Sequence, residues 1–130
     1  MIQPIQWSSS FLVGIEVIDE QHQHMISIIN ALFQELETRI GDIDIQEFFT
    51  DAVNYGDYHF QTEETYFSHR DYPEQEQHLL AHQGYKKTLH ELLESTGDSH
   101  QKASDLLDFL EDWWVSHITG IDQTLASLKK

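Results

Sequence analysis

The sequence of 130 residues contains no cysteine and only two prolines, Pro4 and Pro73. Without cysteine, disulfide bonds, thiolate metal sites and cysteine nucleophiles are all excluded. No run approaches the roughly 18 apolar residues that indicate a transmembrane helix. Residues 1–10 lack both Lys and Arg and contain no apolar stretch like that of a secretion signal. We therefore expect a soluble, cytoplasmic protein, and the lack of cysteine agrees with a reducing compartment.

Basic residues are also scarce. Seven Lys and Arg accompany 23 Asp and Glu, which gives a formal net charge of −16. A surface of this sign repels phosphate backbones and anionic lipid headgroups. We therefore expect neither nucleic acid nor a membrane surface as a partner, and we expect a monomer because the chain reads as one small acidic domain.

Apolar residues recur at helical spacing in four stretches of the chain. These stretches cover residues 19–40, 45–69 and 74–95 and begin again near residue 99. Asp44 with Glu47 resembles a capping box at the start of the second stretch, and Gly41 and Gly97 are suitable helix ends. Four amphipathic helices of about twenty residues with short loops pack most simply as an antiparallel bundle.

The predicted fold is therefore all-α, an up-down-up-down four-helix bundle formed by a single domain over residues 1–130. Residues 1–18, which include Trp7 and Phe11, are expected to form an extended arm across this bundle. Gly120 interrupts the fourth stretch, and a short apolar tail follows it.

Nine histidines are the unusual feature of the composition. His59 and Glu63 are four residues apart, and so are His78 and His82. Four residues advance about 400° around a helix, so both members of each pair project from one face, a turn apart. Two of the four predicted helices thus carry a pair of metal-binding side chains on one face.

The other two predicted helices carry single histidines on their apolar faces, His22 and His117. Asp122 follows His117 by five residues, which is about 140° around a continuous helix. Asp122 would therefore reach the same site only if the helix breaks, and Gly120 between them would permit such a break.

Burying these groups costs roughly 1–3 kcal/mol or more each unless a partner satisfies them. A lone inward histidine is more often a packed core residue than a ligand. Five or more that converge from four helices favour a metal ion, because one centre satisfies them all. Imidazole together with carboxylate suits iron, copper, zinc or nickel rather than calcium or magnesium.

The remaining histidines are expected to lie at the surface. His24 is about 200° around the helix from His22, and His69 and His100 fall at predicted helix ends. His90 is also expected to face solvent, with a hydrogen bond to a ligand as the alternative.

Four segments of the sequence resemble the bacterial members of the hemerythrin family. They are GIEVIDEQHQHM (14–25), HFQTEE (59–64), HLLAH (78–82) and WWVSHITGID (113–122). They occur in the order and at the separations typical of that family, and Trp7 falls where the family has its N-terminal tryptophan. The resemblance implies a bundle that holds two iron ions (Fe2+/Fe3+) with an oxo or hydroxo bridge. It also implies reversible binding of dioxygen, for oxygen storage or for delivery to oxygen-requiring enzymes.

The resemblance assigns seven metal ligands. One iron would take the three histidines His78, His82 and His117. The second iron would take His22 and His59. The two bridging carboxylates would be those of Glu63 and Asp122. For two six-coordinate irons these ligands and the oxygen bridge leave one position open, on the iron with two histidines, where one dioxygen would bind.

A dry pocket without proton donors is expected around that open position. Six side chains are the expected lining, a role compatible with core packing: Met25, Phe60, Trp113, Trp114, Ile118 and Ile121. Met25 takes a place often held by leucine in the family, and Trp114 adds bulk beside Trp113.

Three alternatives remain open at this stage, namely a di-iron oxidase, an oxygen or redox sensing module, and a structural or zinc-binding bundle. Ferritin-like oxidases use Glu-x-x-His pairs and four carboxylates, but no histidine here follows a glutamate by three residues. Five imidazoles and two carboxylates stabilise high-valent iron less well, so we expect no enzymatic activity. Sensors of the family usually carry signalling domains, for which we expect no room in this chain. A structural or zinc site has no need of seven ligands.

Overall fold

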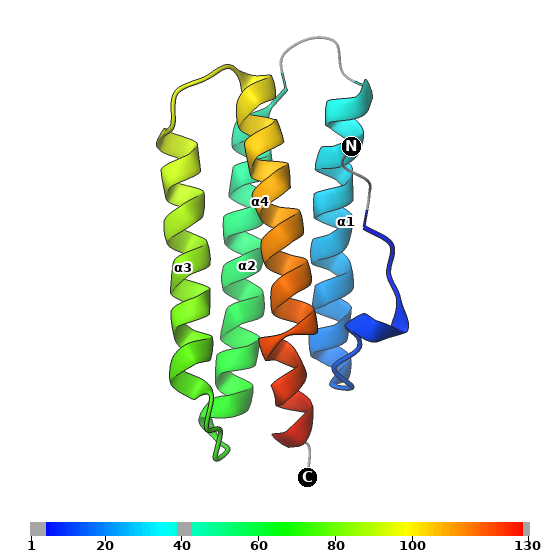
Figure 1. Ribbon diagram of the computed structural model, residues 1–130, viewed down its shortest axis with the longest axis vertical. Helices are drawn as coiled ribbons and strands as arrows, with labels where there is room; N and C mark the ends of the chain where they lie inside the picture. Colours follow the sequence, from blue (N-terminus) through cyan, green and yellow to red (C-terminus); the bar gives the residue numbers. More distant parts are fainter. Residues whose placement is uncertain (1–4, 39–42, 129–130) are drawn as a thin grey trace.

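Four antiparallel helices form the body of the computed structural model, which describes residues 5–38 and 43–128 (Figure 1). They are α1 (Glu16–Thr38), α2 (Ile45–Ser68), α3 (Gln75–Glu94) and α4 (Ser99–Thr119). Each helix packs against the next one in sequence, and α4 also packs against α1, so the four close into a ring. The prediction of an all-α, up-down-up-down bundle is confirmed.

Short polar signals set the helix starts. The side chain of Asp44 accepts a hydrogen bond from the backbone N–H of Glu47 at 3.3 Å, so the predicted cap of α2 is present. Asp98 caps α4 in the same way, through the N–H of Gln101 at 2.8 Å. Gly97, just before it, has a φ of +134°, which favours glycine. The predicted helix end at Gly41 lies outside the described residues.

The N-terminal arm lies along α1 and packs on the bundle (Figure 1). The Asn30 side chain of α1 holds it: the amide oxygen accepts from the N–H of Ile5, and the amide nitrogen donates to the Ile5 carbonyl, both at 2.8 Å. Phe11 enters the main core. The arm differs from the prediction in two ways, because a 3-10 turn, η1 (Ser9–Phe11), interrupts it and α1 already begins at Glu16.

The buried core is divided into two clusters of apolar side chains. The larger cluster fills most of the bundle and includes Met25, Ile29, Leu32, Phe49, Phe60, Tyr85, Leu106, Leu110 and Trp114. The smaller one lies near the end of the bundle where α1 begins and consists of Val13, Ile18, Phe67, Tyr72 and Leu125. Along α1, His22 lies between Ile18 of the small cluster and Met25 of the large one. The polar site described below therefore has apolar packing on both sides.

None of the helices within residues 5–38 and 43–128 combines the length and apolar character needed to cross a membrane.

Candidate metal centre

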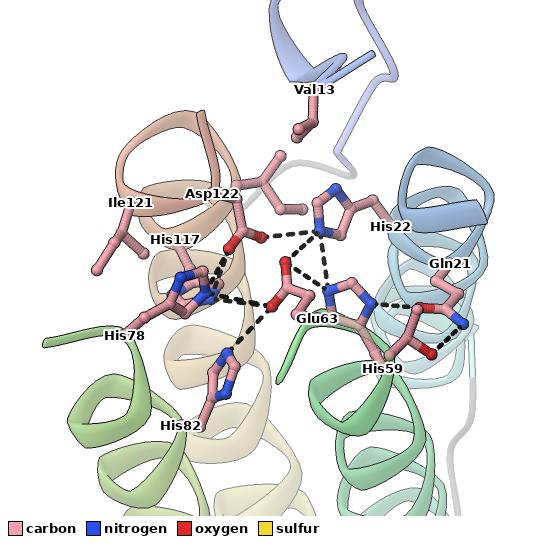
Figure 2. A network of polar contacts seen from close by, with 12 residues as sticks. Val13, Gln21, His22, His59, Glu63, His78, His82, His117, Ile121 and Asp122 are labelled. Atoms are coloured by element: carbon pink, nitrogen blue, oxygen red, sulfur yellow. Dashed lines mark hydrogen bonds and ion pairs between the residues drawn. The ribbon is translucent and has the colours of Figure 1, made fainter. Parts of the chain in front are cut away.

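Seven polar side chains converge at the end of the bundle where α1 and α3 begin and α2 and α4 end (Figure 2). All seven are buried, with at most 5% exposure, and five of them are histidines whose Nε2 atoms face two carboxylates. The seven are the predicted ligands His22, His59, Glu63, His78, His82, His117 and Asp122. The chain thus brings together every ligand that the sequence assigned.

The seven residues form two groups that could each hold a metal ion. Within each group one ligand atom per residue lies within 4.8 Å of all the others. The first group is Glu63, His78, His82 and His117, and the second is His22, His59, Glu63 and Asp122. The three-histidine and two-histidine sets are those expected from the resemblance.

The Glu63 carboxylate divides its two oxygens between the groups. Its Oε1 lies 3.0 Å from Nε2 of His82 and 3.3 Å from Nε2 of His78. Its Oε2 lies 3.4 Å from Nε2 of His59 and 3.8 Å from Nε2 of His22. Glu63 is therefore placed to bridge two ions.

The Asp122 carboxylate is divided in the same way. Its Oδ1 lies 2.9 Å from Nε2 of both His78 and His117, and its Oδ2 lies 2.8 Å from Nε2 of His22. Two carboxylates thus span the same two groups from different helices, which is the arrangement of a two-metal site.

A helix break brings Asp122 into the site, as the sequence predicted. α4 ends at Thr119, and after Gly120 the chain continues as a 3-10 helix, η2 (Ile121–Leu128). A Cβ atom on Gly120 would lie 2.6 Å from the carbonyl oxygen of Ser116, closer than any side chain tolerates. Glycine at this position therefore permits the change of helical winding that brings Asp122 beside His117.

The donor set fits metal ions on two physical grounds. Five buried atoms of the centre make no well-aligned hydrogen bond within the described residues, despite the short contacts above: Glu63 Oε2, His78 Nε2, His117 Nε2 and both carboxylate oxygens of Asp122. Such atoms are costly unless a cation satisfies them. Ligand atoms about 2.1 Å from one ion and at right angles lie about 3 Å apart, which matches the shorter contacts above.

Outer hydrogen bonds fix two of the imidazoles. The Nδ1 of His59 lies 2.6 Å from Oε1 of Gln21, whose amide nitrogen donates to Thr62 (Figure 2). The Nδ1 of His78 lies 2.9 Å from the Tyr72 hydroxyl. Because the amide oxygen of Gln21 only accepts, Nδ1 of His59 must donate, which leaves Nε2 with a lone pair for a metal.

The direction of the Tyr72 hydrogen bonds follows from its neighbour. The hydroxyl of Thr124 donates to the Ile121 carbonyl at 2.5 Å, so it accepts from the Tyr72 hydroxyl at 2.6 Å. Tyr72 then accepts from Nδ1–H of His78. With Nδ1–H committed to Tyr72, the lone pair of the neutral His78 ring lies on Nε2, the atom that a metal ion would take.

Comparison with known proteins agrees with this geometry. The profile of the hemerythrin HHE cation binding domain matches residues 13–128. The chain belongs to the hemerythrin family. Bacteriohemerythrin of Stenotrophomonas maltophilia (strain R551-3) is 28% identical to the chain, over 95% of the chain and 80% of that protein. Hemerythrins bind non-haem iron, and the cluster of histidines and carboxylates described here suits that metal.

Two further relatives extend the likeness within the hemerythrin family. Bacteriohemerythrin of Clostridium acetobutylicum is 26% identical over 90% of the chain and 95% of that protein. A hemerythrin-like protein of Naegleria gruberi is 27% identical over 92% of the chain and 88% of that protein. These alignments cover nearly the whole chain rather than the ligand segments alone.

The buried carboxylates and histidines of this hemerythrin site shift one another's pKa values. Burial lowers the pKa of His117, but the charge of Asp122 and hydrogen bonds to Asp122 and Glu63 raise it to about 9. Burial and the charge of Glu63 raise the pKa of Asp122, yet His117 and His22 hold it below its usual range. Burial likewise raises the pKa of Glu63, while the charge of His59 and hydrogen bonds from three histidines lower it well below its usual value. The carboxylates thus require positive charge beside them, from protons or from metal ions.

The predicted apolar lining lies around the site. Met25, Trp114 and Ile118 are fully buried. The Phe60 ring stacks on His82 with ring centroids 3.9 Å apart, and the half-buried Trp113 stacks on His117 at 4.2 Å. The six side chains do not share one position, and whether they line an oxygen pocket stays a prediction.

Two members of that set, Trp114 and Ile121, lie at different places. The Trp114 ring lies 5.7 Å from that of His59, on the two-histidine side. Figure 2 shows the half-buried Ile121 side chain directed away from Asp122.

The other histidines lie outside the centre. His24 is exposed, as predicted, and its ring lies 4.3 Å from that of Tyr55. His90 is exposed and pairs with Glu94 at 3.1 Å. It makes no contact with a ligand, so only the surface interpretation of His90 is supported.

Sequence reasoning missed a loop that covers the centre. The Asp19 carboxylate accepts hydrogen bonds from the N–H groups of Val13 at 2.7 Å and Gly14 at 3.0 Å. Gly14 has a φ of +92°, which favours glycine. In Figure 2, Val13 lies on the side of His22 and Asp122 opposite His82, and it is buried in the smaller apolar cluster with Ile18 and Leu125. An aspartate five residues after a glycine was the available signal, but nothing in the spacing showed that the loop folds back over His22.

Proposed function

We propose that this chain binds dioxygen reversibly at two non-haem irons and serves oxygen storage or delivery rather than catalysis. The observation that supports the proposal is the unequal division of ligands between the two groups. Both carboxylates face both groups, whereas one group has three histidines and the other has two. A site with one donor fewer leaves room for an external ligand.

Each ligand has a role in this proposal. One iron would be held by His78, His82 and His117, the other by His22 and His59, with Glu63 and Asp122 shared. An oxo or hydroxo bridge between the irons would complete the set, as expected for the family. When bound, the two irons supply the electrons and the coordination position that dioxygen requires.

The protein's own task is to hold this position dry. Met25 is three residues after His22, on the same face of α1, and is fully buried. Ile118 and Trp114 of α4 are also fully buried. The loop held by Asp19 places Val13 in the smaller apolar cluster, on the other side of the site. Apolar groups on both sides exclude water and its protons, which favours release of the bound oxygen unchanged.

The donor set also favours binding over oxidation. Five imidazoles and two carboxylates bring less negative charge to iron than the four carboxylates of ferritin-like oxidases. High-valent iron is stabilised less, so cleavage of the oxygen–oxygen bond is not favoured. A zinc or purely structural site would explain neither the seven ligands nor their division into two groups.

Oxygen uptake by reduced protein tests the proposal. Protein produced with ample iron is expected to hold two irons per chain and, after anaerobic reduction, to take up one dioxygen per two irons on an oxygen electrode. Degassing should return that oxygen. One zinc and no iron per chain would contradict the di-iron centre, and continued oxygen consumption with release of hydrogen peroxide would identify an oxidase instead.

A further inference from the structure

The outer hydrogen-bond partners of the ligand histidines differ in charge. His59 contacts the neutral amide of Gln21, and His78 contacts the phenol of Tyr72, whose pKa is raised to about 12, chiefly by burial. Of these three histidines, His82 alone has a carboxylate at Nδ1, that of Glu64. Among the described residues, Nδ1 of His22 has no partner. The only carboxylate in this set of outer contacts therefore acts on the three-histidine group.

Two consecutive glutamates of α2 hold opposite nitrogens of one imidazole. Glu63 Oε1 lies 3.0 Å from Nε2 of His82, and Glu64 Oε2 lies 2.8 Å from Nδ1. Phe60 stacks on the ring with an interplanar angle of 11°. The position, plane and rotation of the His82 ring are therefore all fixed before a metal binds.

A carboxylate at Nδ1 changes the imidazole as a ligand. An ionised carboxylate only accepts hydrogen bonds, so Glu64 keeps the hydrogen of the neutral His82 ring on Nδ1, and the lone pair on Nε2 is the one that a metal ion would take. The charge-assisted hydrogen bond increases electron density on the ring and makes Nε2 a stronger donor. A stronger donor favours the more highly charged, oxidised metal ion.

We propose that Glu64 is a positioning residue that acts through His82 to strengthen metal binding in the three-histidine group and to stabilise the oxidised state of that iron. The inference rests on the proposed di-iron function for the identity of the metal, but not on oxygen binding. It assigns the two irons different preferences: the iron of the three-histidine group is oxidised more readily, and the iron beside the open position is not assisted by a carboxylate of this kind.

Glu64→Gln separates charge from shape. Glutamine keeps an acceptor oxygen for Nδ1–H but removes the negative charge, whereas Glu64→Leu removes both. The matched control is Glu91→Gln, which removes one exposed negative charge from α3. Cobalt(II) titration of metal-free protein, followed by visible absorption, measures binding without any use of oxygen.

We expect Glu64→Gln to weaken binding of one of the two cobalt ions about tenfold and Glu64→Leu to weaken it more, within the range for outer partners of metal ligands. Glu91→Gln should bind like the parent. In the iron-loaded protein, one midpoint potential should rise in Glu64→Gln, and a tenfold change in preference corresponds to about 59 mV for one electron.

Two outcomes would overturn the proposal. Unchanged cobalt affinity and potentials in Glu64→Gln would show that the charge has no effect on the metal. A lower free energy of unfolding in metal-free Glu64→Gln, with affinity and potentials as in the parent, would show a structural role alone. Should Glu64→Gln fail to fold, Glu64→Asp keeps the charge but shortens the reach, and parental potentials in that variant would equally refute the proposal. If the parent protein does not bind oxygen, the proposed function is wrong, but the cobalt result still tests the role of Glu64.

Discussion

The Oδ2 atom of Asp122 lies 2.8 Å from Nε2 of His22, which joins the first helix of the bundle to the turn that follows the last. Both side chains are fully buried. The other oxygen of Asp122 faces the three-histidine group, so this one carboxylate connects both halves of the centre. Its position depends on the break at Gly120.

Gly120→Ala is therefore expected to damage the metal centre. The added Cβ would lie 2.6 Å from the Ser116 carbonyl oxygen, so the backbone must shift and carry Asp122 with it. We expect lower iron content and a lower thermal unfolding midpoint, measured by metal analysis and calorimetry.

Gly84→Ala is the matched control, because a Cβ at Gly84 meets nothing within 4 Å. Gly84 lies inside α3, so alanine should stabilise the protein by about 0.5–1 kcal/mol and leave iron content unchanged. Full iron occupancy in Gly120→Ala would show that the winding after α4 is not needed for the site.

Glu63→Ala is expected to lose both metal ions together. Glu63 belongs to both groups, and its removal takes one oxygen from each. Metal binding contributes to folding stability, so the unfolding midpoint should fall too. Glu20→Ala, at an exposed position of α1, should change neither. If Glu63→Ala kept one ion at parental affinity, its carboxylate would not bridge.

Met25→Glu tests where the open position lies. A carboxylate on the face of α1 that carries His22 would reach the two-histidine iron, and a hard anionic oxygen is a good ligand for ferric iron. We expect the variant to keep both irons but to lose azide binding and a stable oxygenated form. Met25→Leu should bind azide like the parent. Parental azide affinity in Met25→Glu would place the open position elsewhere.

The pH dependence of metal-free protein follows from His117. Its pKa is raised from 6.5 to about 9 in the folded chain, so the folded state binds this proton more tightly than the unfolded state does. That stabilisation is complete below pH 6.5 and is lost as pH rises through about 9.

Metal binding should show the opposite trend, because a metal ion must displace the same proton. Between about pH 6.5 and 9 we expect the unfolding free energy of chelator-treated protein to fall and its cobalt affinity to rise. Denaturant titrations and metal titrations across this range measure both. If neither the unfolding free energy nor the cobalt affinity changed over this pH range, Asp122 would not raise the pKa of His117.

The sequence predicted the bundle and all seven converging side chains because both depend on local helical spacing. One helical turn separates His59 from Glu63 and His78 from His82. Gly120 indicated the helix break before Asp122. Local helical spacing could not predict the hydrogen-bond partners of the histidine Nδ1 atoms. Glu64 meets His82 across two helices, so its contact depends on how α2 and α3 are rotated against each other.

The loop that precedes α1 could not be predicted from local sequence patterns either. Asp19 was expected only as the first residue of a helix, but that helix begins at Glu16, and the carboxylate of Asp19 binds the preceding loop. The position of Val13 depends on how this loop folds back onto α1, which the spacing of residues in the sequence does not predict.

Reversible oxygen binding is tested most directly by the absorption spectrum of one reduced, iron-loaded sample under argon, then air, then argon again. The reduced protein should be colourless. Air should produce charge-transfer bands in the visible and near-ultraviolet, and the second argon step should remove them and restore the first spectrum. Bands that persist under argon, or an oxidised spectrum that appears in air together with free hydrogen peroxide, would contradict the claim.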